Sequence, residues 1–194
     1  MTYIYWMLFW TTNEITIDMN TETPLLEQVN SVCCIERRLL MALNIKNLRI
    51  VSPAFTTLER IPKRYTSEGE NISPPLEWSG VPEGTQQLIL ICHDPDAPLP
   101  HGFTHWIIYG IEPTVSQLAQ ADGSKFIEGI NSENQPGYTG PAPPAGHGPH
   151  HYYFWLYALN NKLDLKPGLN REQLLDAIAD HVIEQARLVG TYET

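Results

Sequence analysis

The chain is poor in basic residues, with 12 lysines and arginines against 22 aspartates and glutamates, which gives a formal net charge of −10. Nucleic acids and anionic membrane surfaces attract proteins through an excess of positive charge, so neither is expected as a general partner. Any site for an anion must therefore be a local arrangement of side chains and backbone amides.

Cysteines are also few, at three in 194 residues. Cys33, Cys34 and Cys92 have no metal-binding spacing, and the adjacent pair is poorly suited to an unstrained disulfide. We interpret all three as reduced thiols, which predicts a cytoplasmic protein.

Long hydrophobic runs are missing as well. The apolar segment from Tyr3 to Trp10 is too short to span a bilayer, and it lacks the basic flank of a secretory signal. We expect no integral membrane association.

Common catalytic signatures are absent from the sequence. It contains no Gly-x-Ser-x-Gly elbow, no His-Glu-x-x-His and no Walker loop. We predict that the protein is not an enzyme and that it uses neither a cofactor nor a metal.

The first 40 residues differ from the rest in composition. They hold five of the 19 aromatic residues and two of the three cysteines, and they show no strand alternation. We predict an N-terminal extension over residues 1–40 and one domain over residues 41–194, with Met41 as the hypothetical natural initiator. The alternative is an N-terminal helix, because apolar residues have helical spacing at Leu25, Leu26, Val29, Val32 and Cys33.

Prolines indicate the fold class of the domain. Twelve of the 16 prolines fall between Pro74 and Pro149, which excludes long helices there and favours short strands joined by structured loops. The segment Tyr152–Leu159 is apolar on both faces, as expected of a central strand covered on both sides. The other predicted strands are Leu48–Val51, Leu76–Trp78, Gln87–Cys92 and Thr104–Ile111.

The C-terminal segment carries the strongest helix signal. Asn170 can cap a helix and Gln173 follows three residues later. Apolar residues then repeat on one helical face before Gly190, at Leu174, Leu175, Ile178, Val182 and Ala186. We expect a sheet-based domain with one or two late helices.

The histidines carry the main functional signal. In an extended chain Asp94 and Asp96 share one face, while His150 and Tyr152 project together where the last predicted strand begins. Both pairs can therefore converge on a pocket at the strand ends. Six of the seven histidines lie within 59 residues: His93, His101, His105, His147, His150 and His151.

Such a cluster suits an anion. We expect an aspartate behind a histidine to fix the tautomer and to leave an N–H facing a ligand. Two such histidines, a tyrosine hydroxyl and loop amides would bind a phosphate or a carboxylate. Since a carboxylate facing a phosphate is repelled, at least one aspartate should orient a histidine or contact a ligand's ammonium or hydroxyl group.

Each of these residues also has a purely structural interpretation. The run Asp94-Pro95-Asp96 can be a turn, and His105 a hydrogen-bonded core histidine. Tyr152 can simply pack in the core, and Cys92 is better explained as a buried strand residue than as a nucleophile.

Four motifs in order carry a family resemblance: Ser73-Pro74-Pro75-Leu76-Glu77-Trp78, Asp94-Pro95-Asp96-Ala97-Pro98, Thr104-His105-Trp106 and the segment from Gly140 to Tyr152. Together they resemble the phosphatidylethanolamine-binding protein family, in particular its bacterial and archaeal Raf kinase inhibitor-like (YbhB/YbcL-like) branch. The resemblance runs from about residue 48 to residue 192. It implies a mainly β fold, a β-sandwich with a large central sheet, a smaller sheet and C-terminal helices.

The resemblance also implies a ligand pocket. In it, His105 and His150 line the anion site and Tyr152 donates its hydroxyl. Ala142 stands where some relatives have glycine, and the approach to His105 is shorter than in mammalian members, so mammalian kinase regulation is not carried over. The predicted ligand-binding residues are Asp94, Asp96, His105, Pro143, Pro144, His150 and Tyr152.

The implied function is binding of a small anionic or zwitterionic ligand with a phospholipid-type head group, together with modulation of an unidentified protein partner. A homodimer is compatible with this resemblance. Two alternatives stay open. One is a metal-dependent hydrolase built on the histidine and aspartate cluster. The other is a protein-interaction module whose pocket is vestigial.

Overall fold

The structure is a computed structural model that describes residues 46–194. The predictions for residues 1–40, for Met41 as initiator and for Cys33 and Cys34 lie outside the described residues. Within residues 46–194, no helix has the length and hydropathy needed to cross a bilayer.

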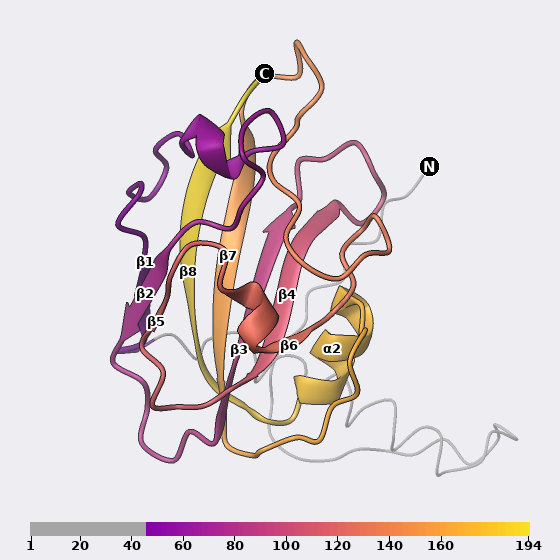
Figure 1. Ribbon diagram of the computed structural model, residues 1–194. Coiled ribbons are helices and arrows are strands. Elements are labelled where there is room, and N and C mark those ends of the chain that lie inside the picture. The colour runs from indigo at the N-terminus through magenta and orange to yellow at the C-terminus, as the bar shows by residue number, and fades with distance from the viewer. Residues whose placement is uncertain (1–45) are drawn as a thin grey trace, which may run out of the picture. The chain divides into compact units, whose positions relative to one another are not determined.

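Two antiparallel sheets form the domain (Figure 1). The larger sheet has the strand order β6-β4-β3-β7-β8 and the smaller one β1-β2-β5. The strands are β1 (Arg49–Val51), β2 (Leu76–Ser79), β3 (Gln87–Asp94), β4 (Phe103–Ile111), β5 (Gln117–Leu118), β6 (Ile127–Glu128), β7 (His150–Leu159) and β8 (Val182–Tyr192). The predicted mainly β, two-sheet fold is confirmed.

Two apolar clusters cover the faces of the larger sheet. The first lies between the sheets, where Leu76 and Trp78 of β2 join Phe154 and Leu156 of β7. The second lies on the opposite face and includes Leu174 and Ile178 of the helix α2 (Arg171–Ile178). The chain is therefore layered as small sheet, large sheet and helix, and Figure 1 shows α2 on the side away from β1 and β2.

All five predicted strands form, close to their expected bounds. The strand that is buried on both faces throughout, however, is β3 and not β7. On β7 the residues facing the small sheet are buried, whereas Tyr153, Trp155 and Tyr157 on the other face are partly exposed and stack in a row. These aromatic rings stack on one another and Arg187 lies over Trp155. The stacking shields the rings from part of the solvent, so this face of β7 can carry apolar residues without full burial.

The predicted C-terminal helix forms only in its first half. Within residues 46–194 there is one α-helix, so the C-terminal helices implied by the resemblance are reduced to one. Helix α2 begins with the expected capping box between Asn170 and Gln173 but ends at Ile178. Residues 182–192 instead form β8, which pairs antiparallel with β7 along its length. Apolar residues four apart share a face in a strand as well as in a helix, so Val182 and Ala186 fit both. Residues 182–192 form a strand because their backbone N–H and C=O groups pair with those along the edge of β7. Two short 3₁₀ turns complete the secondary structure, η2 (Lys63–Tyr65) and η3 (Gly123–Lys125).

Candidate functional site

The site begins where β3 ends and β7 starts. The antiparallel register pairs His93 with Tyr153, which brings the last residue of β3, Asp94, within reach of the first residue of β7, His150. His150 Nδ1 is 2.8 Å from Asp94 Oδ2, and each side chain is only 4% exposed. The other oxygen, Asp94 Oδ1, accepts a hydrogen bond from the backbone N–H of Asp96 at 2.8 Å. Asp94 is thus fully engaged in holding the loop and orienting His150.

A register shift between β3 and β4 places His105 at the site. Cys92 pairs with Trp106 and His93 pairs with Thr104, so His105 is the extra residue of a β-bulge on β4. The bulge turns His105 and Trp106 toward the same side of the sheet, the side of Cys92 and Asp94. Without it, one of these two large side chains would point toward α2.

The ring of His105 is fixed by the backbone. Its Nδ1 donates a proton to the carbonyl oxygen of Thr139 at 2.7 Å, so the neutral ring presents the lone pair of Nε2. Its faces are occupied by Phe103 and by Tyr152, whose ring meets it edge-on at 5.1 Å. Burial lowers the pKa of His105 to about 4, so near neutral pH this side chain is an uncharged acceptor.

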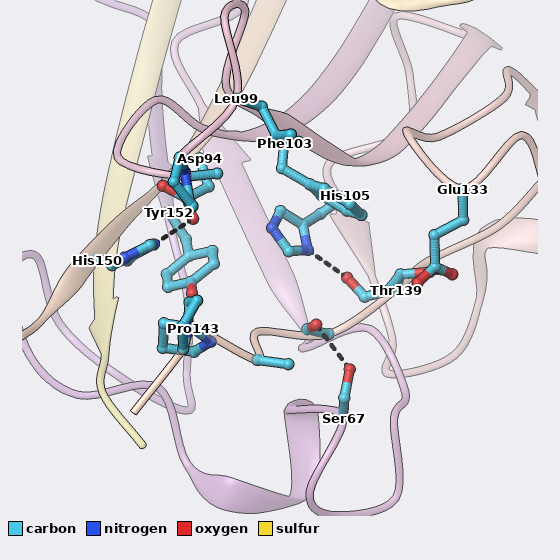
Figure 2. A pocket seen from close by; sticks show the side chains of 15 residues that line it. Ser67, Asp94, Leu99, Phe103, His105, Glu133, Thr139, Pro143, His150 and Tyr152 are labelled. Carbon is cyan, nitrogen blue, oxygen red and sulfur yellow. Dashed lines mark hydrogen bonds and ion pairs between the residues drawn. The ribbon is translucent and has the colours of Figure 1, made fainter. Parts of the chain in front are cut away.

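Tyr152 supplies a hydroxyl donor. Its side chain is 1% exposed, and burial together with the nearby Asp94 and Cys92 raises its pKa well above the ordinary value. The phenol therefore keeps its proton. Figure 2 shows Tyr152 between His150 and His105, which point toward a common space.

That space is a cavity of about 320 Å³. Six of the seven predicted site residues line it: Asp94, His105, Pro143, Pro144, His150 and Tyr152. Pro143 is buried, whereas Pro144 and Ala142 are exposed at the rim. The structure thus brings these six together, and whether they bind a ligand stays a prediction.

Asp96 is the one predicted residue that does not line this cavity. Its carboxylate accepts hydrogen bonds from the backbone N–H and from Nδ1 of His151, at 2.8 and 2.7 Å. Partial burial opposes ionisation, but these bonds outweigh it and lower the pKa of Asp96. The expectation that an aspartate orients a histidine is therefore met twice, by Asp94 with His150 and by Asp96 with His151.

The expected donor role of a neutral histidine needs a correction. Since Asp94 accepts the proton of Nδ1, a neutral His150 would present a lone pair at Nε2 and not an N–H. Only the imidazolium can donate from Nε2 to an anion, and the Asp94 carboxylate is the partner that stabilises it.

Other residues of the cavity carried no signal in the sequence. Ser67 comes from a distant loop, whereas Glu133 and Thr139 belong to the segment between β6 and β7. Glu133 Oε2 accepts a hydrogen bond from the Thr139 hydroxyl at 3.0 Å. Glu133 matters most, because it places an exposed carboxylate at the cavity. A ligand that carries both an anionic and a cationic group would satisfy His150 and Glu133 together.

The cavity lacks the parts of a nucleophilic catalytic site. Within residues 46–194, no hydroxyl or thiol group is hydrogen-bonded to the ring of His105 or His150, and the Ser67 hydroxyl donates to the carbonyl of Gly140. The thiol of Cys92 is buried, and burial raises its pKa well above the ordinary value. The expectation that Cys92 is a buried strand residue is confirmed.

Acid should destabilise the domain through its buried histidines. The folded-state pKa of His105 is about 4 against 6.5 for an ordinary histidine, so the unfolded chain binds the proton first. The stability contributed by neutral His105 is complete above pH 6.5 and is lost as the pH falls through 4. We expect urea denaturation to show about 3 kcal/mol lost from this group between pH 7 and pH 4. His93, with a pKa also lowered to about 4 by burial, adds to the effect.

The control for this prediction is His105→Asn, whose amide can still donate to Thr139. Its stability should fall less steeply with acid than that of the wild type. Equal pH dependence in both proteins would show that His105 is not the group responsible.

Comparisons with known proteins bear on this site. A family model described as phosphatidylethanolamine-binding protein matches residues 51–193, which include all seven predicted site residues. A UPF0098 protein of Methanothermobacter thermautotrophicus is 45% identical over 153 residues, covering 75% of this chain and 98% of that protein.

Solved structures give the same result. A putative phosphatidylethanolamine-binding protein homologue from Chlamydia trachomatis superposes with a TM-score of 0.72 at 40% identity, covering 78% of this chain and 99% of that one. E. coli YbcL superposes with a TM-score of 0.73 at 31% identity, covering 77% and 99%. These likenesses extend over nearly the whole of both relatives.

Proposed function

The chain belongs to the phosphatidylethanolamine-binding protein family, with relatives in bacteria and archaea, and from this premise we propose that it binds a small phosphate-bearing ligand and does not catalyse a reaction. The ligand occupies the cavity between His105, His150 and Tyr152. The phosphate-type head group is the part of the ligand that the cavity recognises.

One observation carries the proposal: a buried aspartate holds a histidine whose free nitrogen is available to a cavity. Asp94 holds Nδ1 of His150 at 2.8 Å, which leaves Nε2 for the cavity. The Tyr152 hydroxyl is a second donor beside it. An anionic oxygen between them would receive two hydrogen bonds, one of them charge-assisted.

A zwitterionic ligand fits better than a bare anion. The neutral His105 offers an acceptor at Nε2, and Glu133 offers a carboxylate. Both groups attract a hydrogen-bond donor and repel a second anion. Phosphoethanolamine, with an ammonium two carbons from its phosphate, matches that distribution of charge.

The two alternatives receive less support. Within the described residues, no group of three or more His, Cys, Asp and Glu side chains is placed to hold a metal ion, which gives the hydrolase no metal site to build on. A protein-interaction module with a vestigial pocket gives no reason for a buried Asp94–His150 pair that lines a cavity. A cytoplasmic location, a modulated protein partner and a homodimer remain predictions from sequence.

Calorimetry of the full chain tests the proposal. We expect phosphoethanolamine to bind more tightly than inorganic phosphate, and the uncharged trimethyl phosphate to give no heat. Titrations in two buffers of different ionisation enthalpy separate the heat of binding from any heat of proton exchange with the buffer. No heat with any of the three compounds would favour the interaction module instead.

A further inference from the structure

The side chain of Trp106 has an unused donor. Trp106 is 1% exposed, and within residues 46–194 its indole Nε1 is the buried side-chain polar atom without a hydrogen-bond partner. By contrast, the indole of Trp78 donates to the carbonyl of Val115 at 2.7 Å. Buried indole N–H groups normally find such a partner. The exception at Trp106 therefore points to a group bound beside it.

A second cavity of about 200 Å³ lies at Trp106. Asn71, Ser73, Ser124, Glu128 and Tyr138 also line it, and none of these lines the cavity of His150. Tyr138 borders this space while its neighbour Thr139 borders the other one. Because a water molecule occupies about 30 Å³ in the liquid, the volume exceeds what one bridging water needs.

Two polar groups of opposite kind face this space. Within the described residues, the Glu128 carboxylate makes no hydrogen bond and no ion pair with a side chain, and it is only partly exposed. A methyl group on Gly123 would stand 2.9 Å from Glu128 Oε1 and 3.1 Å from Trp106 Nε1. The glycine thus keeps open a gap with a donor on one side and an acceptor on the other.

We propose that this second cavity binds a hydroxyl group of an uncharged or cationic ligand, such as a polyol or an amino alcohol. The hydroxyl oxygen accepts the indole proton of Trp106 and the hydroxyl proton is donated to Glu128. A hydroxyl is the simplest group that both accepts and donates in this way. The carboxylate disfavours anions and attracts a cation, which is the reverse of the preference at His150. This inference does not rest on the function proposed above.

Two-dimensional ¹H–¹⁵N NMR of the full chain tests it, with the indole signal of Trp106 assigned by its loss in Trp106→Phe. Glycerol and ethanolamine should each shift this signal saturably, ethanolamine at lower concentration. Dimethoxyethane, which accepts but cannot donate, and inorganic phosphate should leave it unmoved. Phosphate that shifts the signals of His150 alone would show that the two cavities bind separately.

Two variants complete the test. Gly123→Ala, which fills the gap, should weaken glycerol binding at least tenfold. Glu128→Gln, which removes the charge but keeps a polar group, should retain glycerol binding and lose the preference for ethanolamine; it decides the matter if Gly123→Ala does not fold. The proposal is overturned if no compound gives a saturable shift, if dimethoxyethane matches glycerol, or if the indole proton exchanges magnetisation with a bound water only.

Discussion

Replacing His150 with alanine should abolish measurable binding of phosphoethanolamine and phosphate. The variant loses the charge-assisted hydrogen bond from Nε2, and it leaves the Asp94 carboxylate buried without its partner, so that a negative charge then faces the anion. Hydrogen bonds to charged groups contribute about 1.5–3 kcal/mol, which corresponds to a loss of roughly 10- to 150-fold before the unpaired carboxylate adds its repulsion. Isothermal titration calorimetry measures the loss directly.

Asp94→Asn separates charge from shape at the same position. The amide oxygen can still accept the Nδ1 proton of His150, but the negative charge that stabilises the imidazolium is gone. We expect weaker anion binding in this variant, measured by the same calorimetry. His151→Ala is the matched control. The side chain of His151 pairs with Asp96, is 40% exposed and does not line the cavity. Equal losses in His151→Ala and His150→Ala would place the anion outside the cavity.

Replacing Glu184 with alanine should destabilise the domain by about 3 kcal/mol. Glu184 lies on β8 and is 3% exposed, and its Oε1 accepts hydrogen bonds from the backbone N–H groups of Lys46, Asn47 and Leu48. These bonds hold the segment that leads into β1 and the small sheet. Their loss leaves the buried N–H of Leu48 unpaired, whereas Lys46 and Asn47 are exposed and their N–H groups can bond to water. Urea denaturation of the full chain measures the change in the free energy of unfolding.

Glu184→Gln is the control for that prediction. Its amide oxygen can accept the same three N–H groups without the charge, so we expect only about 1 kcal/mol of destabilisation. Replacing Glu172, an exposed glutamate on α2, with alanine should change the free energy of unfolding very little. If Glu184→Ala unfolds at the wild-type urea concentration, the three N–H groups are satisfied in another way and the contact does not stabilise the small sheet.

Most strands of the fold could be predicted from local patterns. Proline-bounded apolar runs located β2, β3, β4 and β7, because Pro interrupts strands and alternation or full burial marks them. The short strands β5 and β6 have two residues each, too few to show a period. The β8 segment was misassigned because its apolar spacing of four satisfies a helix and a strand equally, and the choice depends on a partner strand.

The site shows the same division. Strand parity pointed to Asp94, His150 and Tyr152, since polar residues at the ends of apolar strands are gathered at one edge of a sheet, and the family resemblance added His105. The sequence also indicated correctly that at least one aspartate orients a histidine. It did not show that Asp96 turns to His151 and away from the cavity, nor that Asp94 leaves a neutral His150 without a proton to donate.

Composition and motif order by themselves determined the fold class, the family and six residues of the main cavity. Only the tertiary structure decided which nitrogen of each histidine faces a ligand. The carbonyl of Thr139 fixes the ring of His105, and Asp94 Oδ2 fixes the ring of His150. The β-bulge turns His105 and Trp106 to one side of the sheet. The physical reason is that a local pattern encodes burial and strand period, whereas proton positions and side-chain direction depend on partners brought from distant parts of the chain.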